Sequence, residues 1–185
     1  MDIKALAQKY EPYIIERRRY FHAHPELSFK EWETTKALVA EFEKMGMEIQ
    51  TFPDYPGLIA TLDTGKPGRT VMLRADIDAL PVKEGTGLDF ASQNEGVMHA
   101  CGHDNHMAML LGAAHILLEK KDELKGKVKF LLQSGEEMAC GAKYYVDHHI
   151  LDGVDAIFGQ HIWGTLDAPY VCVASGNRMA SCDNF

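Results

Sequence analysis

The sequence predicts an α/β fold in which helices cover both faces of a sheet. Short apolar segments rich in β-branched and aromatic residues alternate with longer segments whose apolar residues recur at helical spacing. Strands that alternate with helices are typical of a sheet buried on both faces. At 185 residues the chain is long enough for one domain with a substantial core and too short for two large ones.

Two helices are expected before residue 46. The first has an apolar face from Ile3 to Phe21, and Pro12 either kinks this helix or restarts it. Ser28 and Glu31 have the spacing of a capping box, with serine at the cap and glutamate three residues later. An apolar stripe from Trp32 to Met45 then predicts the second helix, and Gly46 is a plausible stop.

Strand patterns follow the second helix. Strands are expected at residues 47–52, 58–62 and 69–75, with a hairpin turn at residues 63–68 between the last two. After a polar, irregular segment at 83–96, a helix is expected from about 104 to 120. The rest of the chain predicts buried strands at 127–133 and 155–160, a helix near 142–149 between them, and one more strand at 170–174.

Composition excludes several classes of protein. The chain has 46% hydrophobic and 25% charged residues, with 19 Lys plus Arg against 27 Asp plus Glu and a net charge of −8, which argues against a nucleic-acid partner. The longest apolar stretch, residues 107–118, is shorter than the ~20 residues of a membrane span. The start shows no export signal, and the four cysteines are scattered, so we expect a cytoplasmic protein with thiols or ligands and no disulfide framework.

The densest cluster of chemically capable residues lies at 98–106, in the loop before a predicted helix. In an extended stretch His99, Cys101 and His103 would face one point, and thiolate and imidazole suit zinc and similar ions. Gly102 would let the backbone bend around an ion, and Asp104 would either cap the helix or hold a ligating imidazole. A polar loop with incidental histidines remains the alternative.

Two adjacent carboxylates, Glu136 and Glu137, follow the apolar strand at 127–133. This is the end of a strand at which α/β sheets place ligands. Gly135 allows a turn, so one carboxylate could bind a metal while the other reaches an attacking water. The alternative is an exposed first helical turn, where glutamate is favoured by the helix dipole.

Three more polar residues occupy similar positions. His161 ends the strand expected at 155–160, and Asp76 and Asp78 share a face at the end of the strand at 69–75. Each signal alone is weak, because strand-end histidines are often structural and aspartates often form turns. Their shared position at strand ends favours a metal site, in which a carboxylate base and a metal would together attack an unactivated carbonyl.

These segments resemble a known family, the amidohydrolase branch of the aminoacylase/carboxypeptidase metallopeptidase superfamily. That branch includes hippurate hydrolases, N-acyl-amino-acid amidohydrolases and auxin-conjugate hydrolases. The resemblance covers nearly the whole chain. It is carried by residues 18–28 (RRYFHAHPELS), 74–81 (RADIDALP) and 98–104 (MHACGHD), and by Glu136-Glu137, residues 159–161 (GQH) and residues 176–181 (GNRMAS).

The resemblance implies a three-layer αβα, zinc-peptidase-like catalytic domain with a mixed sheet, and two divalent ions, manganese or zinc. It implies that Cys101, His103, Glu137 and His161 are metal ligands. Glu136 would be the general base that later gives its proton to the leaving amine, and Asp78 would orient the metal site. The substrate would be a small N-acyl amino acid or similar amide, and the full-length form would be a homo-oligomer.

The chain departs from the family pattern in two ways. Ser134-Gly135 stands where the family usually has Pro-Ala, so the loop loses rigidity. Family members are also about twice as long: a lid and dimerisation domain follows, and then the end of the catalytic domain, which supplies one more metal-binding histidine. We therefore expect residues 1–185 to be the N-terminal portion of the catalytic domain, incomplete and with uncertain activity of its own.

Two other functions compete with a metal-dependent amidohydrolase. In the first, Cys101 is a nucleophile and a histidine is its base. His103 is so near in sequence that a thiolate–imidazole pair with Cys101 would need a strained loop, and no motif indicates an oxyanion hole. Alternatively, the chain is a non-catalytic, truncated or degenerate member that binds one metal or a partner.

Overall fold

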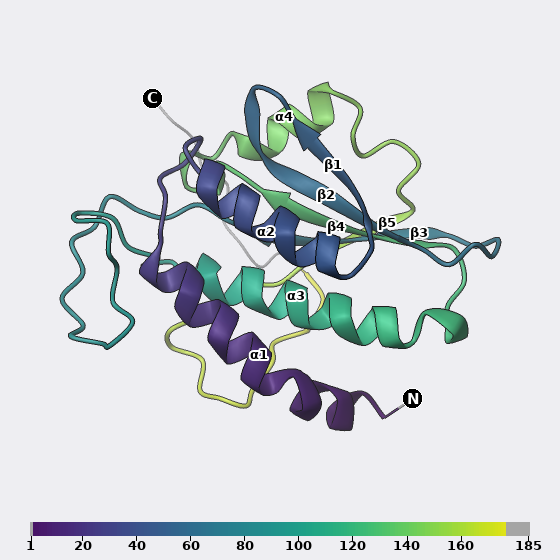
Figure 1. The fold of residues 1–185 in the computed structure, drawn as a ribbon, viewed down its shortest axis with the longest axis horizontal. Helices are drawn as coiled ribbons and strands as arrows, with labels where there is room; N and C mark the ends of the chain where they lie inside the picture. The colour runs from purple at the N-terminus through teal and green to yellow at the C-terminus, as the bar shows by residue number, and fades with distance from the viewer. Residues whose placement is uncertain (1, 177–185) are drawn as a thin grey trace.

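The computed structural model describes residues 2–176, which form a five-stranded mixed sheet between helices (Figure 1). In chain order the elements are α1 (Ile3–Ala23), α2 (Trp32–Lys44), β1 (Glu48–Phe52), β2 (Tyr55–Asp63), β3 (Thr70–Asp76), α3 (His103–Glu119), η1 (Lys121–Glu123), β4 (Lys127–Gln133), η2 (Glu136–Met138), α4 (Gly141–Asp147) and β5 (Ala156–Gly159).

The sheet has the strand order β1-β2-β4-β3-β5. β1 and β2 form an antiparallel hairpin, and β2 pairs antiparallel with β4. β3 runs parallel to both of its neighbours, β4 and β5, and Asp76 at its end is paired with Gln133 at the end of β4. The carboxyl ends of these three parallel strands therefore meet at one edge, where open α/β sheets place their sites.

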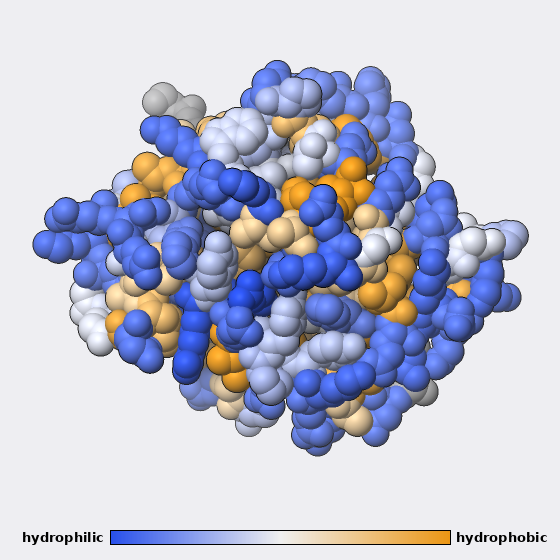
Figure 2. Space-filling model, in the orientation of Figure 1, coloured by the Kyte–Doolittle hydropathy of each residue, from blue (hydrophilic) through white to orange (hydrophobic). Residues whose placement is uncertain are grey.

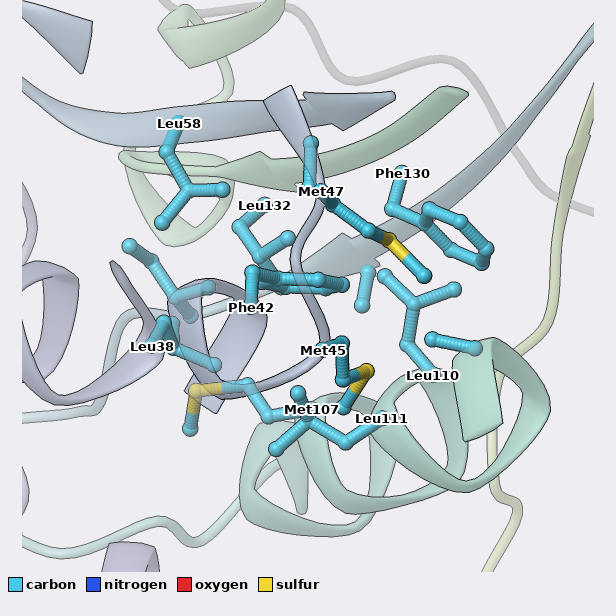
Figure 3. Packing of buried hydrophobic residues seen from close by; sticks show 14 of the residues in the cluster. Leu38, Phe42, Met45, Met47, Leu58, Met107, Leu110, Leu111, Phe130 and Leu132 are labelled. Carbon is cyan, nitrogen blue, oxygen red and sulfur yellow. The ribbon is translucent and has the colours of Figure 1, made fainter. Parts of the chain in front are cut away.

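The larger part of the core lies between the sheet and the helices α1, α2 and α3. Phe42 of α2 packs on Phe130 of β4, with 5.7 Å between the ring centroids, and Leu111 of α3 closes the layer. Figure 3 shows these side chains filling the space between the helices and the strands. A smaller cluster on the opposite face packs Tyr145 of α4 against Ile59, Met72 and Leu131. The expected three-layer arrangement is confirmed.

Four local expectations are wrong. Residues 63–68 do not turn a hairpin, because β2 and β3 both pair with β4, which lies between them. β5 forms at the expected place but is an exposed edge strand, with Phe158 60% exposed. Residues 170–174 form no strand. Ser28 does not cap α2, whose N-cap is Glu31 with no side-chain cap bond. Of the two possibilities for Pro12, the structure excludes a restart, because α1 runs through it.

The surface is mainly hydrophilic on the face shown in Figure 2, where apolar atoms appear in separate small patches. This agrees with a sequence in which 25% of the residues are charged. Among the described residues, no helix has both the length and the apolar character needed to cross a membrane.

Replacing Phe130 by alanine tests the role of the main core. Phe130 is fully buried on a central strand, so Phe130→Ala should lower the free energy of unfolding by about 3–5 kcal/mol. Urea unfolding followed by circular dichroism measures the loss. Val146→Ala, at a 59% exposed position on α4, is the control and should stay within about 0.5 kcal/mol of the wild type. Equal losses in the two variants would contradict this assignment of the core.

A buried ion-pair cluster between α1 and α2 predicts a pH-dependent stability. Burial by itself raises the pKa of Glu41, but hydrogen bonds from Lys44 and Tyr13 and the charge of Arg17 outweigh it and lower the pKa. A carboxyl group whose pKa is lower in the folded protein than in the unfolded chain stabilises the fold at pH values above its pKa in the unfolded chain. This stabilisation is lost as the pH falls through the pKa of the group in the folded protein.

Glu41→Gln should therefore cost about 1–3 kcal/mol at pH 7, the range for hydrogen bonds to a charged group. The difference from the wild type should narrow as the pH is lowered through about 4, near the ordinary carboxyl pKa. Denaturant unfolding at several pH values measures the difference in the free energy of unfolding between the two proteins. A difference that stays constant across this pH range would contradict the prediction.

Candidate metal centre

The site is assembled at the edge where β3, β4 and β5 end and α3 begins. Asp76 is the last residue of β3, and Asp78 follows it in the loop. Glu136 and Glu137 form the short η2 turn after β4, and His161 follows β5. His103 is the first residue of α3. Four segments that are far apart in sequence thus contribute side chains to one place.

Two glycines make the close approaches possible. Gly102 precedes α3 with a φ of +88°, and an added Cβ would lie 2.3 Å from the Ile162 side chain. Gly135 has a φ of +72°, and an added Cβ would lie 2.2 Å from the Phe29 ring. Glycine adopts this left-handed region without the steric cost of a side chain. Gly102 therefore lets Cys101 and His103 approach the segment that carries His161, and Gly135 makes the turn that the sequence predicted.

His103 is the common member of every candidate ligand group among the described residues. One group joins Cys101, His103 and His161, a second joins His103, Glu136 and Glu137, and a third joins Asp76, His103 and His106. In each group the potential ligand atoms lie within 4.8 Å of one another. The Nε2 atom of His103 is 3.7 Å from Glu136 Oε2 and 3.8 Å from Glu137 Oε1. The predicted ligands are therefore brought together.

Hydrogen bonds fix the tautomers of the two predicted histidine ligands. His103 Nδ1 donates to the backbone carbonyl of Asp78 at 2.8 Å, and His161 Nδ1 donates to the carbonyl of Ile162. A carbonyl only accepts, so Nδ1 carries a proton in both rings, and the neutral form of either ring has its lone pair at Nε2. His161 Nε2 lies 3.4 Å from Cys101 Sγ, and His103 Nε2 is buried without a hydrogen-bond partner in residues 2–176. Metal-binding histidines are held in this way through their second nitrogen.

The electrostatics of the site favour a bound cation. Burial and the nearby carboxylates Glu137 and Glu136 together raise the pKa of Cys101 to about 12. Burial and the charge of Asp76 also raise the pKa of Glu136. A divalent cation would reverse both effects, because it stabilises the thiolate and the carboxylates as ligands. Thiolate, imidazole and carboxylate together form a donor set that suits zinc, and the carboxylates also accept manganese.

Asp78 supports the site residues through hydrogen bonds and does not belong to any of the candidate ligand groups. It is fully buried, and its Oδ2 atom accepts hydrogen bonds from Ser28 Oγ at 2.7 Å and from the backbone N–H of Glu137 at 2.9 Å. Burial would raise its pKa, but His103 and these two donors lower it, so the carboxylate is ionised. Asp78 thus connects His103 to the turn that carries the glutamates.

His106 is the site residue that sequence reasoning missed. It accepts a hydrogen bond from the backbone N–H of Ile162 at 3.2 Å, and its ring centroid lies 4.6 Å from that of His161. Its Nδ1 atom lies 3.7 Å from Asp76 Oδ2. The signal was present in the sequence, because residues three apart on a helix share a face, and His103 and His106 have that spacing.

Two expectations about the 98–106 cluster are wrong. His99 does not face the same point as Cys101 and His103, because α3 already begins at His103; His99 is buried and belongs to none of the ligand groups. Asp104 neither caps α3 nor holds a ligating imidazole. It pairs instead with His22 Nδ1 at 2.8 Å and Arg18 Nε at 2.9 Å, which ties α1 to α3. Residues 177–181 of the last quoted motif lie outside the described part of the chain.

The fold and the donor set define an α/β domain with a candidate centre for divalent metal ions. Comparison with family models matches residues 72–173 to peptidase family M20/M25/M40. The chain belongs to this family, as the resemblance of its motifs implied.

Relatives of known name are similar over nearly all of this chain. An N-acyl-L-amino acid amidohydrolase of Geobacillus stearothermophilus is 41% identical over 100% of the chain and 50% of its own length. An N-acetylcysteine deacetylase of Bacillus subtilis is 45% identical over 93% of the chain and 46% of its own length. The chain thus spans about half the length of the curated relatives it matches.

A solved structure supports the same assignment. The YXEP protein of Bacillus subtilis, described as a dinuclear metal binding peptidase from the M20 family, has a TM-score of 0.80 and 44% identity to this chain. The match covers 88% of this chain and 45% of that protein. The similarity therefore extends over most of the fold described above.

Metal titration tests the proposed ligands. Cys101→Ser and His103→Ala should each lower the affinity for Zn²⁺ or Mn²⁺ by at least about tenfold, because each removes a ligand and not only its support. Isothermal titration calorimetry measures affinity and stoichiometry. Cys140→Ser, at an exposed free cysteine, is the matched control and should bind as the wild type does. Unchanged binding in both Cys101→Ser and His103→Ala would remove the ligand assignment.

Proposed function

We propose that this chain forms most of a two-metal site that hydrolyses the amide bond of N-acyl amino acids or similar small amides. The observation that carries the proposal is the convergence of Cys101, Glu136, Glu137 and His161 on the Nε2 side of His103. The names of the relatives support the reaction class, since they include an amidohydrolase and a deacetylase.

In this proposal Cys101, His103, Glu137 and His161 hold two divalent ions, zinc or manganese. The bound ions would polarise the amide carbonyl and make water a stronger acid. His103 and His161 present Nε2 because their Nδ1 protons are held by backbone carbonyls. Asp78 is a positioning residue, since it contacts His103 and the Glu137 backbone and belongs to none of the candidate ligand groups.

Glu136 acts as the general base. It is adjacent to the ligand Glu137, its carboxylate faces His103 Nε2, and burial together with Asp76 raises its pKa towards the working range of a base. Glu136 takes a proton from water while the water oxygen bonds to the amide carbon. The carbon–nitrogen bond then breaks, and Glu136 returns the proton to the leaving amine nitrogen.

The alternative in which Cys101 is the nucleophile has less support. A nucleophilic cysteine needs a lowered pKa, whereas burial and the surrounding carboxylates raise the pKa of Cys101 to about 12. His103, His161 and Glu137 lie near its sulfur, and each of them is also a candidate metal donor. This environment supports a ligand better than a nucleophile.

Three wider expectations belong to the proposal. Because the chain spans about half of its relatives, we propose that residues 1–185 are the N-terminal portion of a catalytic domain. We further propose that the full-length form is a cytoplasmic homo-oligomer. Its partner would be the small amide substrate.

Substituting the proposed base separates catalysis from binding. Glu136→Gln should reduce hydrolysis of N-acetyl and N-benzoyl amino acids by about 10²–10⁴-fold, because proton transfer is lost while the ligands remain. Released amine is measured in the Mn²⁺- or Zn²⁺-loaded protein, before and after chelation and metal return. Glu33→Gln, at an exposed position on α2, is the control and should keep wild-type turnover.

Several outcomes would overturn the proposal. Full activity in Glu136→Gln would remove the assignment of the base, and activity that survives chelation would remove the metal. Metal binding without any turnover by the wild-type chain would favour the non-catalytic alternative.

A further inference from the structure

Residues 28–31, whose spacing resembled a capping box, lie against the turn that carries the two glutamates. This turn, residues 134–138, is called the glutamate turn below. The backbone of the preceding residues is fixed beside the loop after β3, because Ala79 N–H donates to Glu26 O at 2.8 Å and Leu27 bridges to Ala79. Residues 28–31 are therefore held close to the site before any side-chain contact is considered.

Glu31 contacts the glutamate turn directly. Its two carboxylate oxygens lie 2.8 and 2.7 Å from Ser134 Oγ and share the single hydroxyl proton, and Oε1 also accepts a hydrogen bond from the backbone N–H of Gly135 at 3.1 Å. Glu31 is 0% exposed, although it stands at the N-cap of a helix. Both donor residues, Ser134 and Gly135, come immediately before Glu136 and Glu137.

Two neighbours of Glu31 hold the same turn. Ser28 Oγ donates to Asp78 Oδ2, the oxygen that also accepts the Glu137 N–H. Phe29 has a φ of +63°, which is uncommon for a residue with a side chain, and its ring covers Gly135. Ser28 thus reaches the glutamate turn through Asp78, Phe29 contacts it with its ring, and Glu31 contacts it with its carboxylate.

The burial of Glu31 is costly, and helix capping does not explain it. The groups that lower the pKa of Glu31 are hydrogen-bond donors, Ser134 and backbone N–H groups, and not cations; burial outweighs them and raises the pKa to about 7. A buried carboxyl group without a cation is unfavourable unless hydrogen bonds compensate it. An exposed serine or aspartate would cap α2 at no such cost.

The residues before the glutamates need an external support. Ser134-Gly135 contains no proline, which would fix φ and stiffen the backbone, and glycine has the widest conformational range of all residues. The hydroxyl of Ser134, however, is an additional donor, and it points at Glu31.

We infer that Glu31 is a positioning residue, which holds the glutamate turn through Ser134 and Gly135 so that Glu136 and Glu137 face His103. The inference rests on the proposed function for the roles of the two glutamates. The contacts from Glu31 to the turn do not depend on that function, and this allows the two to be tested separately.

Amide hydrogen exchange in the metal-free protein tests the contact itself. Glu31→Leu removes both acceptor oxygens at similar volume, so the Gly135 amide loses its acceptor and the Glu137 amide, which donates to Asp78, loses the support of the turn. Exchange of both amides should quicken about tenfold, as expected when a buried hydrogen bond is lost. Glu31→Gln keeps one acceptor and should restore most of the protection. Glu41→Leu, at another buried glutamate of α2, is the matched control and should leave both amides unchanged.

Titration of the same variants with Mn²⁺ tests the consequence for the site. Glu31→Leu should lower Mn²⁺ affinity about 10- to 100-fold, the range for groups that orient metal ligands, while Glu31→Gln and Glu41→Leu stay near the wild type. Ser134→Ala removes one donor and should give a smaller loss. It also provides the test if Glu31→Leu does not fold.

The possible results separate the two claims. Wild-type Mn²⁺ affinity in both Glu31→Leu and Ser134→Ala, with the Glu137 amide still protected, would overturn the positioning role. An equal loss in Glu41→Leu would also overturn it, because the effect would then be general destabilisation. If the wild-type protein itself binds no Mn²⁺ or Zn²⁺, the proposed function fails, and the exchange rates still decide whether Glu31 holds the turn.

Discussion

The hydrogen bond from His103 Nδ1 to the Asp78 carbonyl is the contact around which the site is organised. It joins the first residue of α3 to the loop after β3 and leaves Nε2 facing the glutamates, Cys101 and His161. The carboxylate of the same aspartate accepts the Glu137 N–H and the Ser28 hydroxyl. Asp78 thus connects the loop after β3 to α3 and to the turn after β4, and a shift at Asp78 would move proposed ligands in both of these segments.

The arrangement concentrates groups that are unfavourable when buried together. Asp76, Asp78 and His103 are almost fully buried, and Glu136 and Glu137 are partly buried beside them. Such a cluster is stable only if hydrogen bonds and a cation compensate it, and if the rest of the domain supplies enough stability to hold it. The large apolar layer between the sheet and α1, α2 and α3, shown in Figure 3, provides that support.

Local patterns predicted those parts of the fold that depend on local interactions. β4 coincides with the expected strand, α3 begins one residue before its expected start, and α4 forms near its expected place. The errors arise where pairing decides the outcome. A turn at residues 63–68 is compatible with a hairpin, but β4 takes the position between β2 and β3. The apolar segment at 155–160 looked buried, although in the described residues β5 has a neighbour on one side only.

The sequence by itself determined which residue types stand at the strand ends, and hence that thiolate, imidazole and carboxylate donors occur at positions that parallel strands bring together. The tertiary structure alone decided their partners: Ser28 and Glu31 contact the site, Asp104 pairs with α1, and His106 lies beside His161. The physical reason is that periodicity and propensity reflect interactions over a few residues. Contacts between residues 50 to 100 apart depend on strand order and helix packing, which no local segment encodes.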